Sequence, residues 1–119
     1  MARQTGRKVA ENVGFAGSDL TMISTAISEL ARNIIRYAQK GEVVVSPISD
    51  GARAGVMVVA RDSGPGIPDI DLAMRDGYTT GSGMGLGLPG ARRLMDEFSI
   101  HSQVAEGTTV VMKKWTRGL

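Results

Sequence analysis

Three polar side chains, Glu29, Asn33 and Arg36, recur along one side of a long amphipathic segment. At about 100° per residue, a helix would bring them within about 40° of one another. A carboxylate and an amide oxygen one turn apart can flank a magnesium–phosphate group, or the carboxylate could act as a general base. The same residue types are also typical of a solvated helix face, where Glu29 would pair with Arg32 or Arg36.

A second candidate site is the segment Asp-Ser-Gly-Pro-Gly-Ile at residues 62–67, directly after a predicted strand. An aspartate at a strand end can accept a hydrogen bond from an exocyclic amine. Gly64 and Gly66 would let the backbone come close to a flat ring. The alternative is a plain turn, because Asp, Ser, Gly and Pro all form turns.

A third candidate is the segment Gly-Ser-Gly-Met-Gly-Leu-Gly-Leu at residues 81–88, which leads into a predicted helix. Alternate glycines expose successive N–H groups, and the helix N-terminus adds partial positive charge, so this segment favours phosphate binding. No Gly-Lys-Ser/Thr is present, which excludes a Walker-type loop. Residues 85–90 match the dinucleotide pattern, but the match is treated as accidental because a loop rather than a strand precedes it.

The remaining pattern predicts helices over residues 2–13, 18–39 and 86–97 and strands over 42–48, 55–60, 98–104 and 108–115. Ser18 is the expected N-cap of the long helix, and at most a short helix is expected near 70–75. The core stripe of the long helix comprises Leu20, Ile23, Ile27, Leu30 and Ile34. These elements predict an α/β (α+β) fold: a two-layer sandwich with a mixed, mostly antiparallel sheet covered on one face by helices.

Composition narrows the class of protein. The 119 residues suggest a single domain over residues 1–119. A formal charge of +2 and an aromatic fraction of 4% give no support to nucleic-acid binding. The chain has no cysteine, which excludes a disulfide framework and fits a cytoplasmic location. No apolar run reaches membrane-spanning length.

The three segments occur in an order that resembles the N, G1 and G2 boxes of the GHKL (Bergerat-fold) superfamily of ATPases and kinases. Gly107 and Thr108 resemble the late Gly-Thr pair beside the adenine of that superfamily. Residues 27–33, 76–80 and 87–98 are most similar to serine kinases of the anti-sigma and stressosome group, including the stressosome switch kinases.

The resemblance implies a role for each matching position. Glu29 would be the catalytic base, Asn33 the Mg²⁺ ligand, and residues from about 69 to 82 the ATP lid. The residues expected at the ATP site are Asn33, Arg36, Tyr37, Asp62, Gly64, Gly66, Ile67, Thr80, Gly81, Ser82, Gly83, Met84, Gly85, Leu86, Gly87 and Thr108.

The resemblance also implies an ATP-dependent protein serine/threonine kinase that phosphorylates STAS-domain scaffold proteins. It would then be released to activate a downstream phosphatase or other regulator. An anti-sigma factor that sequesters a sigma factor under the control of ATP is the alternative. One departure is that related kinases begin with a strand before the first helix, whereas this sequence starts almost at that helix. His101, the one histidine, lies in a predicted strand and is expected to be structural.

Overall fold

The computed structural model describes residues 2–37, 40–66, 74 and 87–116. Its helices are α1 (Ala2–Val13), α2 (Gly17–Tyr37) and α4 (Gly87–Leu94). Its strands are β1 (Gly41–Asp50), β2 (Arg53–Asp62), β3 (Glu97–Gln103) and β4 (Gly107–Trp115).

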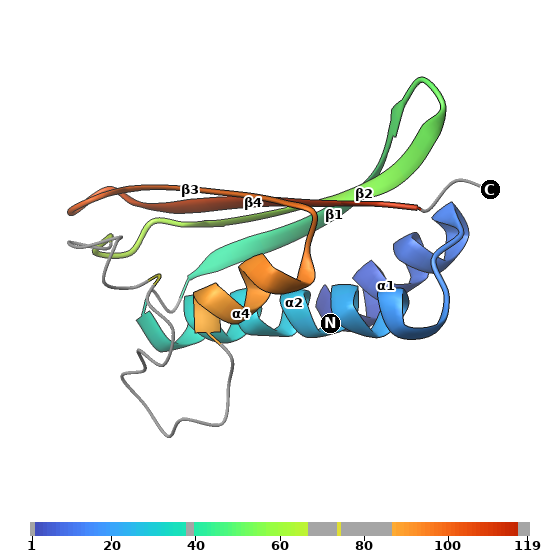
Figure 1. The fold of residues 1–119 in the computed structure, drawn as a ribbon. Helices are drawn as coiled ribbons and strands as arrows, with labels where there is room; N and C mark the ends of the chain where they lie inside the picture. The colour runs from blue at the N-terminus through green and yellow to red at the C-terminus, as the bar shows by residue number, and fades with distance from the viewer. Residues whose placement is uncertain (1, 38–39, 67–73, 75–86, 117–119) are drawn as a thin grey trace.

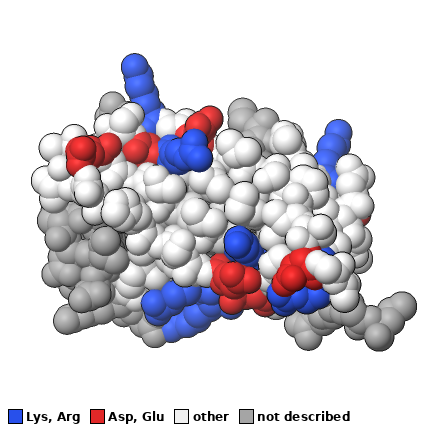
Figure 2. Space-filling view, turned by 90° about the horizontal axis from the view of Figure 1, so that it is seen from above, with Lys and Arg blue, Asp and Glu red and all other residues white. Residues whose placement is uncertain are grey.

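The strands form one sheet in the order β1-β2-β4-β3, and each neighbouring pair is antiparallel. The described helices all lie against one face of this sheet (Figure 1). The predicted two-layer α+β architecture is therefore confirmed, although the described strands pair only in the antiparallel direction. The other face of the sheet carries mostly uncharged side chains over its middle, with charged groups toward its edges (Figure 2).

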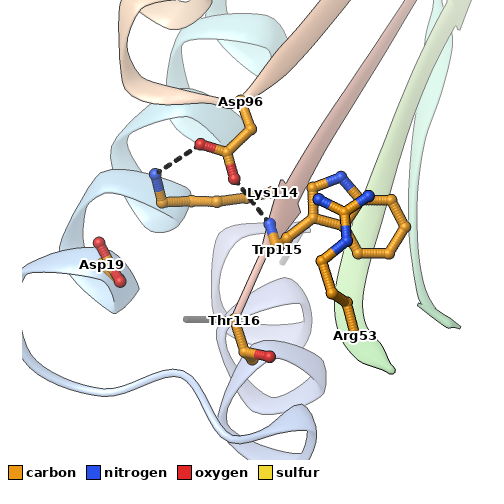
Figure 3. A pocket seen from close by; sticks show the side chains of 6 residues that line it. All are labelled: Asp19, Arg53, Asp96, Lys114, Trp115 and Thr116. Atoms are coloured by element: carbon orange, nitrogen blue, oxygen red, sulfur yellow. Dashed lines mark hydrogen bonds and ion pairs between the residues drawn. The ribbon is translucent and has the colours of Figure 1, made fainter. Parts of the chain in front are cut away.

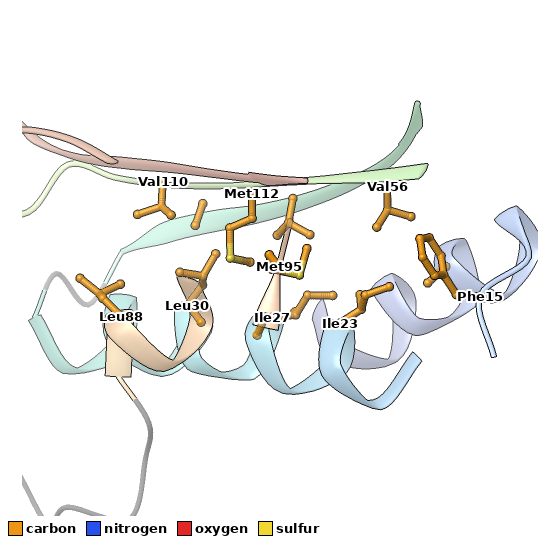
Figure 4. Close-up of a cluster of buried hydrophobic side chains, with 14 of the residues drawn as sticks. Phe15, Ile23, Ile27, Leu30, Val56, Leu88, Met95, Val110 and Met112 are labelled. Carbon is orange, nitrogen blue, oxygen red and sulfur yellow. The ribbon is translucent and has the colours of Figure 1, made fainter. Parts of the chain in front are cut away.

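The core lies between α2 and the two central strands. The whole predicted stripe of α2 is buried, with Ile23 and Ile27 fully so. Its partners on the sheet are alternate residues of β2 and β4, because side chains in a strand point to opposite faces in turn. Figure 4 shows this contact, with Leu88 of α4, Met95 just after α4 and Phe15 of the α1–α2 turn closing the core.

Several predicted boundaries were wrong by a few residues. The last described helix ends at Leu94 rather than Glu97, because the Asp96 N–H donates to the Lys113 carbonyl at 2.9 Å and starts a strand ladder. The buried Lys114 ammonium caps the helix by donating to the Leu94 carbonyl, also at 2.9 Å. The long helix begins at Gly17, so Ser18 is its second residue and not its N-cap.

The sequence analysis also placed the polar turn between β3 and β4 slightly too late in the chain. Val104, expected at the end of a strand, lies in the turn, and Ala105 adopts a positive φ of 69°. The predicted lid and the short helix near 70–75 fall outside the described residues, apart from Met74. None of the described helices is both long enough and apolar enough to cross a membrane.

Candidate nucleotide-binding site

Three polar side chains form a row across adjacent strands at one end of the sheet. Asp62 of β2 pairs with Thr108 of β4, and Thr108 pairs with Ser102 of β3. Each lies an even number of residues from the buried or half-buried residues of its strand. All three side chains therefore lie on the helix-covered face. Side chains directly opposite each other on neighbouring strands lie about 5 Å apart. The structure therefore brings two predicted site residues together and adds a third, Ser102.

Hydrogen bonds fix the orientation of this row. One carboxylate oxygen of Asp62, Oδ1, accepts from the Gly64 N–H at 2.9 Å, which folds the following loop back over the strand end. The hydroxyls of Ser102 and Thr108 lie 2.7 Å apart, and Thr108 is buried. This hydrogen-bonded end of the sheet can present oxygen acceptors to an amine.

Two glycines allow the loop after β2 to meet the turn between β3 and β4. A Cβ at Gly66 would overlap the backbone of Gln103, and one at Gly107 would overlap the carbonyl of Asp62. Both glycines also have positive φ, of 81° and 119°. The contact is completed by the Ala105 N–H, which donates to the Pro65 carbonyl at 2.8 Å. Gly66 and Gly107 therefore permit close packing of backbone on backbone. The expected approach of Gly66 to a flat ring stays a prediction.

Glu29 is almost fully buried although it belongs to the polar side of α2. Its Oε1 accepts from the Arg32 guanidinium at 2.7 Å, and the side chains of Arg32 and Glu29 are 49% and 8% exposed. The predicted ion pair therefore exists. Its carboxylate is buried, however, whereas both groups of an ordinary surface ion pair are exposed to solvent. Burial of a carboxylate is costly unless it is paired, so this position is unusual for a purely structural residue.

The end of α2 that follows Glu29 lies close to the row on the sheet. Asn33 is half-buried one turn beyond Glu29. A Cβ built at Gly41 would lie 2.9 Å from Cγ2 of Ile34 and 3.1 Å from Cβ of Asp62. The helix that carries the first candidate group and the strand end that carries the second therefore converge at Gly41.

The other predicted site residues are only partly described by the structure or lie outside the described residues. Arg36 and Tyr37 are helical, but their side chains are outside the described residues. Ile67, Thr80, Gly81, Ser82, Gly83, Met84, Gly85 and Leu86 are also outside the described residues. Gly87 is the first residue of α4, which agrees with a glycine segment that leads into a helix. Phosphate binding by this segment remains a prediction.

A cavity of about 290 Å³ lies at the other end of the sheet and is distinct from this site (Figure 3). It is lined by Asp19, Arg53, Asp96, Lys114, Trp115 and Thr116. Gly55 pairs with Trp115 there, whereas Asp62 pairs with Thr108 at the candidate site. Asp62 lies seven positions along β2 from Gly55, a separation of roughly 20 Å.

The described residues fit an adenine nucleotide. Asp62 and Thr108 carry oxygens that could accept a hydrogen bond from an exocyclic amine, and the loop after Asp62 is held by the packing of Gly66 on the backbone of Gln103. For Mg²⁺, the described residues contain no group of three His, Cys, Asp or Glu side chains. A magnesium ion here would depend on Asn33 and on phosphate and water oxygens, a ligand set that Mg²⁺ accepts.

Ser102 is the site residue that the sequence analysis missed. It lies in an alternating strand and matches no motif, so its residue type alone gave no signal. Its position could have been inferred by pairing the last two strands through their turn, which sets Ser102 opposite Thr108.

Comparison with known proteins identifies the family of the chain. Residues 1–114 match the model of the histidine kinase-like ATPase domain. The chain belongs to this family of ATP-binding domains.

Individual relatives show which members of the family the chain is similar to. The chain is 52% identical over 116 residues to the serine/threonine-protein kinase RsbT of Bacillus subtilis, covering 98% of this chain and 87% of that protein. It is 38% identical to the anti-sigma F factor of Geobacillus stearothermophilus, covering 81% and 69%. In fold it resembles the mycobacterial sensor histidine kinase MprB, with a TM-score of 0.59 at 18% identity over 84% of this chain and 74% of that one.

Proposed function

We propose that this chain is an ATP-dependent protein serine/threonine kinase of a bacterial stress-signalling pathway. The observation that carries the proposal is the buried carboxylate of Glu29, one helical turn from Asn33, on a helix that converges with Asp62 at Gly41. The 52% identity to a serine/threonine-protein kinase supports the same activity.

In the proposed reaction, the serine or threonine hydroxyl of a protein attacks the γ-phosphorus of ATP. A new O–P bond forms, the bond between the γ-phosphorus and the bridging oxygen breaks, and ADP leaves. Glu29 takes the hydroxyl proton as general base. Asp62 and Thr108 hold the adenine end, which fixes the position of the phosphates relative to Glu29. Mg²⁺, held by Asn33, would neutralise charge on the phosphates.

The glycine-rich segment before α4 completes the proposed ATP site. Gly83, Gly85 and Gly87 would donate backbone N–H groups to the phosphates, and residues 69–82 would close over them. Arg36 and Tyr37 would flank the nucleotide from the end of α2. Support for these roles comes from the order of the motifs and from the start of α4 at Gly87.

For the substrate we propose a STAS-domain scaffold protein, and for the site of action the cytoplasm. After the phosphorylation, release from the scaffold would free the kinase to bind a downstream regulator. The basis is the similarity of residues 27–33, 76–80 and 87–98 to stressosome kinases. The relatives named as a kinase and as anti-sigma factors support protein partners in a regulatory pathway.

The proposal is tested by incubating the chain with ATP, Mg²⁺ and the STAS-domain proteins of its own cell, followed by mass spectrometry. We expect phosphoserine or phosphothreonine on one of those proteins, and none when Glu29→Ala replaces the unaltered chain. ATP binding without transfer to any of those proteins would refute the kinase assignment.

An anti-sigma factor is the second candidate, favoured by the 38% identity to anti-sigma F factors. In that case the chain would bind a sigma factor, and ATP would mainly set the affinity. Co-purification with the sigma factors of the cell, in ATP and in ADP, separates the two functions. Nucleotide-dependent capture of a sigma factor would favour this candidate over the stressosome role.

A further inference from the structure

The cavity at the other end of the sheet is lined by a buried ammonium group, that of Lys114. The Lys114 side chain is 7% exposed, and its Nζ donates to the Leu94 carbonyl at 2.9 Å. Its ion pair with Oδ1 of Asp96 spans 3.9 Å, which is too long for a hydrogen bond. An ammonium has three N–H donors, so the described residues leave part of its donor capacity unused. A buried cation is costly unless it is well partnered.

The neighbouring side chains hold Trp115 in a fixed position at this cavity. The backbone N–H of Trp115 donates to Oδ2 of Asp96 at 2.8 Å, and its indole Nε1 donates to Glu97 at 2.6 Å. The guanidinium of Arg53 lies 4.1 Å from the centre of the Trp115 ring (Figure 3). The lining therefore combines the buried ammonium with a second cation and an aromatic side chain.

The charges of the lining decide which anion it favours. Arg53 and Lys114 are balanced by Asp19 and Asp96. A carboxylate adds one negative charge and can accept strong hydrogen bonds from an ammonium. A phosphate group carries more than one negative charge at neutral pH, so the two aspartates would repel it more strongly. The cavity of about 290 Å³ is at the small end of the range for ligand pockets, which suits a side chain better than a nucleotide.

We propose that this cavity is a carboxylate-binding site in which Lys114 donates to the bound group. The carboxylate comes from an acidic side chain of a partner protein or from a free short-chain acid, which present the same chemical group. The inference does not depend on the proposed nucleotide site, which lies roughly 20 Å away along β2. Bound ATP should therefore leave the affinity for a carboxylate unchanged.

Trp115 makes the proposal directly testable, because the chain has a single tryptophan. Its fluorescence is followed while the full chain is titrated with propionate or with the capped peptide acetyl-Gly-Glu-Gly-amide, at constant ionic strength. Propionamide and the matching glutamine peptide are the neutral controls. We expect a saturable change with the carboxylates and none with the amides. Inorganic phosphate should bind more weakly than propionate.

Matched lysine variants separate a built site from general charge attraction. Lys114→Met keeps the length of the side chain but removes its charge, so the affinity for the carboxylates should fall at least about tenfold. Lys113→Met removes the same charge from the opposite face of β4 and should leave the affinity unchanged. Thermal melting checks that each variant is folded. If Lys114→Met does not fold, amide NMR shifts of the unaltered chain replace it. They should saturate at Asp96 and Thr116 but not at Thr108.

The possible outcomes each decide the question. Binding of the glutamate peptide alone would assign an acidic side chain of a partner, and binding of propionate alone would assign a free acid. Equal responses to acids and amides, or no response to any of them, would overturn the proposal. Equal losses in Lys114→Met and Lys113→Met would also overturn it, as would phosphate binding as tight as that of propionate. Displacement of the carboxylate by ATP would place it at the nucleotide site instead. A chain that failed to bind ATP but bound carboxylates would refute the nucleotide site alone.

Discussion

Glu29 and Asp62 are both carboxylates, but their surroundings differ. Glu29 is buried on α2 and forms an ion pair with a half-exposed arginine. Asp62 ends a central strand and is tied to the loop that follows it. The sequence predicted both residues from their motifs. It left open whether Arg32 or Arg36 pairs with Glu29, and the structure shows an ion pair with Arg32.

Glu29→Ala should abolish phosphoryl transfer while nucleotide binding is retained. General bases contribute about 10²- to 10⁴-fold to rate, so we expect a fall of at least about 10²-fold in kcat with the ATP dissociation constant nearly unchanged. Single-turnover transfer and calorimetry measure the two quantities. Glu11→Ala, at an exposed glutamate of α1, is the control and should retain full activity. Equal losses of binding and transfer would argue against a base role.

Asp62→Asn should weaken ATP binding itself. The variant replaces a charged acceptor by an amide, and hydrogen bonds to charged groups are worth about 1.5–3 kcal/mol. This corresponds to roughly one to two decades in the ATP dissociation constant, measured by calorimetry. Asp50→Asn, at an exposed ion pair far along the same hairpin, should have little effect on affinity. An unchanged affinity in Asp62→Asn would remove this residue from the adenine site.

The helices and strands were predicted more completely than their ends. The stripe of α2 and the alternation of the strands report a buried face directly, because burial follows the period of each element. The end of α4 was missed because it depends on Lys114, a residue distant in sequence that caps the Leu94 carbonyl. A contact of this kind leaves no mark near the helix end itself.

Lys114 therefore joins α4 to β4. Its side chain is 7% exposed, and its ammonium donates to Leu94 and lies 3.9 Å from Asp96. Lys114→Ala removes this bond and part of the packing, so we expect the free energy of unfolding to fall by about 2 kcal/mol. Urea denaturation measures this change. Lys113→Ala, on the opposite face of the same strand, should change it by less than about 0.5 kcal/mol. Equal effects would contradict a special role for Lys114.

At the scale of the whole molecule, both layers share one core. Ile27 is fully buried at its centre, whereas Ile35 on the same helix is 71% exposed. Ile27→Ala should lower the free energy of unfolding by about 2–5 kcal/mol, and Ile35→Ala by less than about 0.5 kcal/mol. We expect both variants to unfold in a single cooperative transition, which circular dichroism can monitor. Two separate transitions would show that the layers unfold independently.

The two-layer arrangement was predictable from the element pattern, but the strand order was not. Turn residues link β1 to β2 and β3 to β4, so the sequence predicts two hairpins. It does not predict which strand of one hairpin pairs with which strand of the other. The structure pairs β2 with β4 through long-range contacts. That pairing sets Asp62 beside Thr108, so their proximity could not be read from local sequence even though each residue was predicted from its own motif.

The placement of β4 has a consequence for biosynthesis. Among the described strands, β4 comes last in the chain, and it is a central strand that joins the β1–β2 hairpin to β3. A nascent chain that ends before Gly107 has Asp62 but neither Thr108 nor the contact between Gly107 and Asp62. Such a chain cannot assemble the adenine end of the proposed site. Nucleotide can therefore act as a ligand that stabilises the finished fold, but not as a template for its early stages.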